Sequence, residues 1–324
     1  MGLDWRDNIK NTKDIRVAFF TEAGYSRGMG HIVRSFTIGD KFKSLGIKTF
    51  LFLDSDESFD DKFDDLNYFS WKDFKLTKDY DAIFIDSYEA DIDVYHKIAK
   101  ACKLPVYLDD FKRLDYPSGV VINFAPESDT TYYKYRQEKH TYLLGLKYMP
   151  IRSEFLTAEV VKKEKIFIML GGSDTANLSL ELLHSLKDVA LTKQIVTNDR
   201  KILNSLKKYD NVEILYKPSN LQLVESMASS SIAISTASMS AYELAYLKIP
   251  TIIIAVAKNQ EIGLPLFIKN NIALDFVSIE NKNWQDDLMN KVKFNVYKKN
   301  HNINQLIDGK GTENIVHKIL ELIK

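Results

Sequence analysis

The stretch IRVAFFTEAGYSRGMGHIVRSFTIGDKFKSLG, residues 15–46, combines an apolar run, a glycine-rich turn and an amphipathic segment. The run IRVAFF (15–20) has the length and the continuous apolarity of a strand that is buried on both faces of a parallel sheet. The turn GYSRGMGH (24–31) holds three glycines and ends on a histidine, and residues 32–46 predict a helix. A strand, a turn and a helix in this order form the first part of a βαβ unit.

The same alternation continues along the chain. Further strands are predicted at 48–53, 82–87, 105–110, 119–124, 141–145, 165–170, 194–197, 212–215, 232–235 and 251–256. Helices are predicted at 93–103, 177–186, 221–230 and 240–247. This order predicts an α/β protein with two Rossmann-like, doubly wound domains. Pro150 and the charged run 162–165 place the boundary, so we expect domains at 1–155 and 156–324 with a cleft between them.

Composition narrows the function classes. Lys plus Arg and Asp plus Glu both number 44, so the net charge of zero does not indicate a nucleic-acid binder or a polybasic membrane anchor. Cys102 is the single cysteine, which excludes an intramolecular disulfide and a cysteine metal cluster and fits a reducing compartment. The apolar runs are far below the roughly 20 residues of a membrane helix. Residues 1–14 lack a signal-peptide core and receive no role. We expect a cytoplasmic protein that does not insert into a membrane.

His31 is the histidine whose surroundings indicate chemistry. It sits at a glycine-rich strand-to-helix turn, whereas His96, His184 and His317 lie in helical segments of mixed polarity. A helix N-terminus disfavours the imidazolium and so favours a neutral imidazole at pH 7. Such a group can act as general base toward water, although a structural histidine is equally compatible with the turn.

The second half contains two segments that could hold a phosphate. The turn at 171–174 follows a strand and precedes a helix, where backbone amides and the helix start attract anions. Its candidate ligand-binding residues are Gly171, Gly172, Ser173, Asp174 and Asn177. An ordinary capped turn explains the same letters, and no P-loop motif is present.

The segment ISTASMSAYELAYLKIP (234–250) is built similarly. Ser238 and Ser240 can donate to phosphate, and the carboxylate of Glu243 can accept from a ribose diol or simply complement the helix dipole. Asn259 and Gln260 follow a predicted strand and could read a sugar or base edge, or cap a turn.

Together these motifs resemble the nucleotide-sugar hydrolases of pseudaminic acid biosynthesis, the PseG-type family, which are related in fold to GT-B glycosyltransferases such as MurG. The resemblance runs from about residue 16 to the C-terminus. It rests on GMGHIVRS (28–35), IDSY (85–88), VYLDDF (106–111), VINFAPES (121–128), LLGLKYMPIRSEF (143–155), MLGGSDTANLSLELL (169–183), SMSAYE (238–243), KNQE (258–261) and IDGKGTENIVHKIL (307–320).

The resemblance implies a GT-B-like fold and a hydrolase that releases UDP from UDP-2,4-diacetamido-2,4,6-trideoxy-altrose, with no metal and no cofactor. It implies that His31 is the general base, that Tyr88 lines the sugar pocket and that Asn259 faces the substrate. It further implies that Glu243 holds the ribose. Gly30, Arg34, Ser238, Ser240, Gln260 and the 171–177 turn complete the implied substrate contacts.

The sequence departs from this family at positions expected to face the sugar. Phe20 and Glu22 stand where the family has an Arg-x-Asp pair, and Ser87 replaces a histidine. A related but different activated sugar is therefore open. Three other functions compete: a GT-B glycosyltransferase, a nucleotide-sugar binding protein without activity, and a nicotinamide oxidoreductase, against which the spacing of Gly24, Gly28 and Gly30 argues. The oligomeric state is not indicated.

Overall fold

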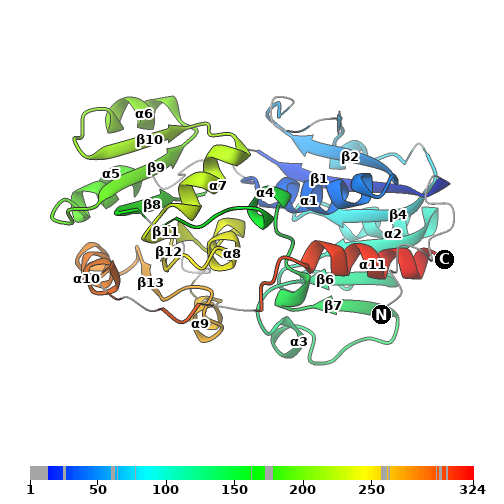
Figure 1. Cartoon of the computed structure of the whole chain (residues 1–324). Coiled ribbons are helices and arrows are strands. Elements are labelled where there is room, and N and C mark those ends of the chain that lie inside the picture. Colours follow the sequence, from blue (N-terminus) through cyan, green and yellow to red (C-terminus); the bar gives the residue numbers. More distant parts are fainter. Residues whose placement is uncertain are drawn as a thin grey trace. The chain divides into compact units, whose positions relative to one another are not determined.

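The structure is a computed structural model. The structure describes residues 14–24, 27–59, 63, 65–76, 78–161, 163–171, 178–256, 261, 263–296, 298, 301–303 and 306–324. The chain forms two compact units, of which the first comprises the residues up to Ile151 together with Gly309–Lys324, and the second comprises Arg152–Asp308 (Figure 1).

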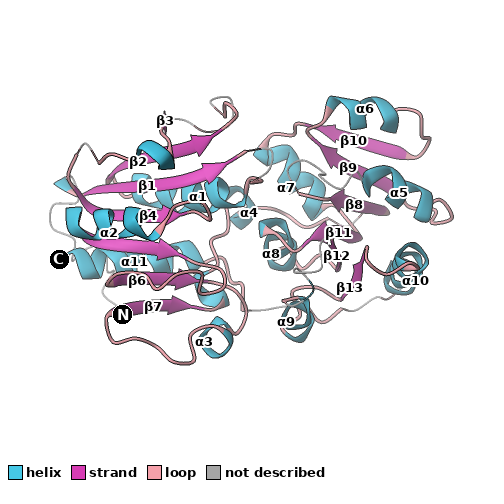
Figure 2. Cartoon of the chain, turned by 180° about the vertical axis from the view of Figure 1, so that it is seen from behind, coloured by secondary structure: helices cyan, strands magenta, loops and turns pink. Residues whose placement is uncertain are grey.

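Unit 1 is a parallel sheet with helices on both faces (Figure 2). Its strands are β1 (Arg16–Ala23), β2 (Lys48–Ser55), β3 (Leu66–Tyr68), β4 (Tyr80–Asp86), β5 (Cys102–Leu108), β6 (Gly119–Asn123) and β7 (His140–Leu144). Its helices are α1 (Gly30–Ser44), α2 (Ile92–Ala101), α3 (Ser128–Thr131) and α11 (Gly311–Ile323), with short 3-10 turns η3 (Trp71–Asp73) and η4 (Leu146–Tyr148). The strands are ordered β3-β2-β1-β4-β5-β6-β7.

Strand β1 is an interior strand of this sheet, between β2 and β4, and is buried on both faces. Phe19 packs its ring against Phe42 of α1, with centroids 6.2 Å apart. The next residue, Phe20, belongs to the cluster that contains Tyr95 and Ile98 of α2. Because successive side chains of a strand point to opposite faces, α1 and α2 cover opposite sides of the sheet. The continuous apolar run at 15–20 therefore has its physical reason in this two-sided burial.

Unit 2 repeats the plan. Its strands are β8 (Lys165–Met169), β9 (Thr192–Thr197), β10 (Val212–Tyr216), β11 (Ile232–Thr236), β12 (Thr251–Ala255) and β13 (Asp275–Ser278). Its helices are α4 (Ser153–Leu156), α5 (Leu178–Ser185), α6 (Arg200–Leu206), α7 (Asn220–Ala228), α8 (Met239–Tyr246), α9 (Leu264–Lys269) and α10 (Trp284–Val296). All pairings are parallel, in the order β10-β9-β8-β11-β12-β13.

The structure differs from the predicted domain division at the C-terminus. Helix α11 packs against α1 and η4, so it belongs to unit 1, whereas chain order placed it in a domain at 156–324. Gly311 permits this packing, because a Cβ there would lie 2.0 Å from the carbonyl oxygen of Met149. Asn314 Nδ2 also donates to the Lys147 carbonyl at 2.8 Å. The division between the units falls after Ile151, four residues before the expected boundary at 155.

The eleven predicted strands are confirmed within one to three residues at their ends, and β3 and β13 are additional. Both additional strands are short and lie at sheet edges, where a weaker apolar signal suffices. Among the described residues, the helices lack the length and apolarity that crossing a membrane requires.

Candidate active site

The candidate site lies where the strand order of unit 1 reverses. The chain leaves β1 toward α1 and β2 on one side, and leaves β4 toward α2 and β5 on the other. Ligands of open α/β sheets bind outside the carboxyl ends of the strands at such a point. The turn after β1 is closed by hydrogen bonds between Gly24 and Gly28, and Gly28 adopts φ +71°, which a side chain would disfavour. This turn delivers His31 as the second residue of α1.

His31 pairs with Asp86, the last residue of β4. Its Nδ1 lies 2.6 Å from Oδ1 of Asp86, and both side chains are buried. Burial opposes ionisation of Asp86, but the charges and hydrogen bonds of Arg34 and His31 outweigh it and lower the pKa of Asp86 to about 2. The carboxylate is therefore ionised at neutral pH and must accept, so Nδ1 carries a proton and donates. In the neutral imidazole the lone pair then lies on Nε2, which makes no hydrogen bond to the described residues.

Arg34, one turn along α1, links Asp86 to a second carboxylate. Its Nε and Nη2 donate to Asp86 at 2.6 and 2.5 Å, and its Nη1 donates to Asp110 Oδ1 at 2.7 Å. Burial opposes the charge, yet the two carboxylates hold the pKa of Arg34 well above its ordinary value. Arg34 is 6% exposed, so its guanidinium is buried and paired with these two carboxylates.

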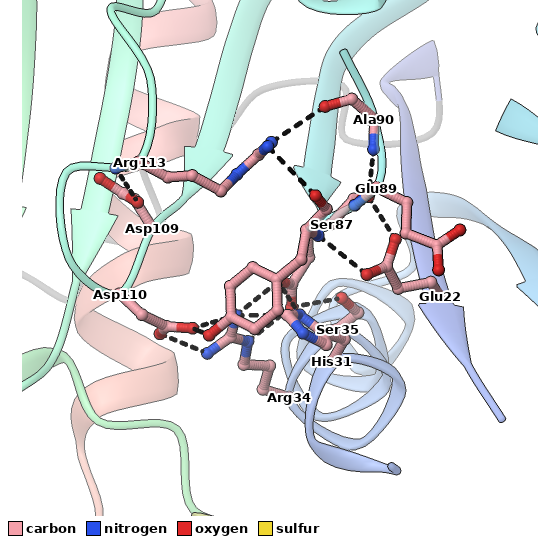
Figure 3. Close-up of polar contacts among 12 residues, drawn as sticks. Glu22, His31, Arg34, Ser35, Ser87, Glu89, Ala90, Asp109, Asp110 and Arg113 are labelled. Atoms are coloured by element: carbon pink, nitrogen blue, oxygen red, sulfur yellow. Dashed lines mark hydrogen bonds and ion pairs between the residues drawn. The ribbon is translucent and has the colours of Figure 1, made fainter. Parts of the chain in front are cut away.

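Tyr88 closes the cluster. Its hydroxyl donates to Oδ2 of Asp110, and its ring meets His31 edge-on with centroids 4.5 Å apart. Although the Tyr88 side chain is half-exposed, desolvation around its hydroxyl and the neighbouring Asp110 raise the pKa of Tyr88, so the phenol stays protonated. His31, Asp86, Arg34, Asp110 and Tyr88 thereby form a closed ring of contacts, which we call the His31 cluster. Figure 3 shows His31, Arg34 and Asp110 of this cluster.

The turn that carries Tyr88 is held from two sides (Figure 3). Glu22, at the end of β1, accepts from Tyr88 N at 2.8 Å, from Trp71 Nε1 at 3.0 Å and from the Ser87 hydroxyl. The Ser87 oxygen in turn accepts from the backbone N–H of residues 89 and 90. From the other side, Arg113 donates to the carbonyl oxygens of residues 88 and 90. The backbone of residues 87–90 is therefore fixed before any ligand binds.

These contacts correct the expectation that Phe20, Glu22 and Ser87 face a sugar. Phe20 is 3% exposed and stacks on Phe52 with centroids 4.5 Å apart, so it is a core residue. Glu22 and Ser87 are 1% and 3% exposed and bond to each other. The departure from the family pattern at these positions therefore concerns the support of the Tyr88 turn.

In unit 2, the described part of the expected nucleotide site lies at the carboxyl ends of β8 and β11. Gly171 follows β8 with φ +89°, and Gly172, Ser173, Asp174, Asn177, Asn259 and Gln260 lie outside the described residues. Ser238 is the N-cap residue of α8, yet its hydroxyl points to the Thr236 carbonyl oxygen at 3.4 Å. Ser240, on the first turn, donates to Met169 Sδ at 3.5 Å.

Glu243 is 1% exposed and forms a bidentate ion pair with Arg152. Arg152 Nε lies 2.7 Å from Oε1, and Nη2 lies 2.8 Å from Oε2. Each carboxylate oxygen keeps a second lone pair, so the pairing orients Glu243 and leaves acceptor capacity. The ribose role of Glu243 stays a prediction.

Sequence reasoning thus selected His31, Arg34 and Tyr88, which the structure brings together, while Gly30 opens α1 with open space around its Cα. It gave no role to Asp86, Asp110 or Arg152. Their partners lie 22 to 91 residues away along the chain. The sequence did contain one indication of the two aspartates, which is their position. Asp86 and Asp110 directly follow apolar strand runs, at the carboxyl ends of strands, where ligands of such sheets bind.

Comparisons with known proteins agree with this architecture. No protein-family model matches the chain. An uncharacterized protein of Methanocaldococcus jannaschii is 26% identical over 276 residues, which cover 74% of this chain and 55% of that protein. A Helicobacter pylori protein named pseudaminic acid cytidylyltransferase and UDP-2,4-diacetamido-2,4,6-trideoxy-beta-L-altropyranose hydrolase is 23% identical over 295 residues, 86% of this chain and 54% of its own length. The chain spans about half the length of these curated relatives.

Solved structures show the fold. MurG of Acinetobacter baumannii superposes with a TM-score of 0.61 at 11% identity, covering 95% of this chain and 99% of MurG. LpCGTa in complex with UDP gives a TM-score of 0.62 at 10% identity, with coverages of 95% and 99%. The chain has the GT-B fold. UDP-GlcNAc 2-epimerase of Methanocaldococcus jannaschii shares it, with a TM-score of 0.57 at 11% identity and coverages of 95% and 100%.

Proposed function

We propose that the chain is a nucleotide-sugar hydrolase that removes UDP from a UDP-linked diacetamido-trideoxy sugar by attack of water at the anomeric carbon. The observation that carries this proposal is the His31–Asp86 pair, which leaves Nε2 of His31 as an acceptor at the ligand-binding edge of unit 1. The name of the Helicobacter pylori relative supports the identity of the sugar and a place in pseudaminic acid biosynthesis.

The reaction follows from the atoms of the His31 cluster. Nε2 takes a proton from water while the water oxygen bonds to the anomeric carbon from the face opposite UDP. The bond between that carbon and the β-phosphate oxygen breaks, and its electron pair leaves with UDP. The products are UDP and the free sugar with inverted anomeric configuration. Asp86 stabilises the imidazolium that forms, since Nδ1–H already donates to it.

The imidazolium that forms stays next to the ionised carboxylate of Asp86. Arg34 lies between the two carboxylates of the cluster, Asp86 and Asp110, and pairs with both. Arg34 keeps Asp86 ionised and in position, so it acts as a positioning residue. The Tyr88 hydroxyl is taken up by Asp110, so Tyr88 contributes its ring.

For the nucleotide, we propose the contacts that the sequence predicts. The turn at 171–177 and the start of α8, with Ser238 and Ser240, are proposed to bind the diphosphate through backbone amides. Glu243, oriented by Arg152, is proposed to accept from the ribose. Asn259 and Gln260 are proposed to contact the substrate. Charge on the leaving UDP is then held by the protein, and the reaction is expected to require no metal.

The test is release of UDP from UDP-2,4-diacetamido-2,4,6-trideoxy-altrose without any acceptor. Wild type is expected to release UDP, also in EDTA. His31→Ala is expected to lose turnover by about 100- to 10,000-fold while still binding UDP in a calorimetric titration. His96→Ala, which removes an exposed histidine of α2, serves as the matched control and should keep full activity. UDP release only after addition of a sugar acceptor would identify a glycosyltransferase instead, because the same base can deprotonate an acceptor hydroxyl.

A further inference from the structure

Two aromatic side chains at the His31 cluster are exposed: Tyr88, which belongs to the cluster, and Phe111, which follows Asp110 in the chain. Tyr88 and Phe111 are 49% and 50% exposed, whereas His31 and Asp86 are 6% and 1% exposed. Their ring centroids lie 5.7 Å apart, and the Tyr88 ring also contacts the imidazole. The two rings, which we call the aromatic shelf, thus present apolar surface next to the proposed base.

The shelf is held in place by the protein itself. The backbone N–H of Tyr88 donates to Glu22, its carbonyl accepts from Arg113, and its hydroxyl donates to Asp110. Phe111 directly follows Asp110, whose carboxylate is bound by Arg34. Exposed aromatic rings on a fixed backbone lose little conformational entropy when a ligand covers them, which favours binding.

The chemistry of the shelf selects an apolar part of a ligand. The only polar atom of its two side chains is the Tyr88 hydroxyl, and that hydroxyl donates its proton to Asp110. The ring carbons that remain favour methyl and methylene groups, and they offer no partner to a sugar hydroxyl that loses its water.

We infer that the aromatic shelf is a subsite for a methyl-bearing edge of the sugar, and that Phe111 is a specificity-determining residue. This inference rests on the proposed function, because a sugar whose anomeric carbon faces His31 Nε2 places its ring substituents beside the imidazole. The methyl group can belong to a 6-deoxy carbon or to an acetamido group, which share the same apolar character. The shelf then disfavours hydroxymethyl or free amino groups at that position.

The experiment compares three UDP-sugars: the 2,4-diacetamido-2,4,6-trideoxy compound, its 6-hydroxy analogue, and its analogue with one free amine in place of an acetamido group. The kcat/KM for UDP release is measured for wild type, Phe111→Ala and Tyr135→Ala. Tyr135 is 79% exposed in the same unit, and its ring contacts Lys134, so it controls for loss of an exposed aromatic side chain. A single group in an apolar pocket typically changes kcat/KM by about 10- to 200-fold.

We expect wild type and Tyr135→Ala to prefer the parent compound over one analogue by roughly 10-fold or more. Phe111→Ala should reduce that same preference to about its square root, for example from about 10-fold to about 3-fold, since half of the apolar contact is gone. The analogue concerned identifies which methyl group the shelf takes. If wild type releases UDP without preference for either methyl group, or if Phe111→Ala keeps the preference, the shelf is not the subsite although the hydrolase stands. If no UDP is released, the proposed hydrolase function is wrong. The dissociation constants of the same three compounds for wild type and Phe111→Ala then test the shelf, with the same ratios expected. If none of the compounds binds, the shelf is not a sugar subsite.

Discussion

Asp86→Asn is expected to lower both turnover and stability, because the Asp86 carboxylate binds both His31, the proposed base, and the buried guanidinium of Arg34. An asparagine can turn its NH2 group toward Nδ1 of His31, which then accepts, so the proton moves to Nε2 and blocks the base. The expected loss in kcat is about 100- to 10,000-fold, the usual contribution of a positioned general base. UDP binding should be unchanged, since no residue proposed for the nucleotide contacts Asp86.

The stability change can be worked from the pKa. The pKa of Asp86 falls from 3.8 to about 2 in the folded chain, which corresponds to about 2.4 kcal/mol of unfolding free energy at neutral pH. Because the folded pKa is the lower one, this contribution is complete above about pH 5 and is lost as the pH falls through about 2. About 1.3 kcal/mol of it remains at pH 3. The difference in stability between wild type and variant should therefore shrink by nearly half between pH 7 and pH 3.

The assay combines steady-state UDP release with urea unfolding at pH 7, 5 and 3. Asp81→Asn is the matched control, because Asp81 lies in the same strand, near the end opposite Asp86, and its carboxylate accepts from Arg16 N and Lys103 Nζ. It should keep kcat. Full kcat in Asp86→Asn, or a stability difference that does not change with pH, would refute the reasoning that Asp86 is ionised and orients His31.

Two further predictions concern the supports around the sites. Glu22→Gln places an amide donor against the donors of Trp71 and Ser87, so the Tyr88 turn should loosen and kcat should fall about 10- to 100-fold with UDP affinity retained. Steady-state kinetics at a temperature where both proteins are folded test this prediction. An unchanged kcat would show that the turn needs no carboxylate. Arg152→Met should destabilise the protein by about 3–5 kcal/mol in urea unfolding, because Glu243 is left buried and unpaired. The double variant with Glu243→Met should recover most of that loss, and equal losses in both would mean that the ion pair is not the cause.

Most of the fold could be predicted from the sequence because burial on both faces leaves a direct trace. Runs such as 166–170 and 252–256 are apolar throughout, and they lie in interior strands of the unit 2 sheet, β8 and β12. The same property hides which face a residue points to. Phe20 therefore read as a possible sugar contact, although it points into the aromatic core behind β1.

The site was predictable only where one local motif carries it. His31 and Arg34 are three residues apart on α1, directly after a turn whose glycines are themselves a signal. Asp86 and Asp110 acquire their roles through Arg34, which lies 52 and 76 residues away in sequence. Such pairings depend on strand order, which local patterns do not determine. Helix α11 shows the same limit, because its return to unit 1 is a tertiary contact of Gly311 with Met149.

The measurement that tests the central claim most directly is UDP release in water enriched in oxygen-18, without acceptor, with mass analysis of both products after rapid quenching. Attack of water at the anomeric carbon predicts that the label enters the sugar and that the UDP contains none, with release lost in His31→Ala. Label in the phosphate oxygens of UDP, or full release by His31→Ala, would contradict a hydrolase that uses His31 to activate water.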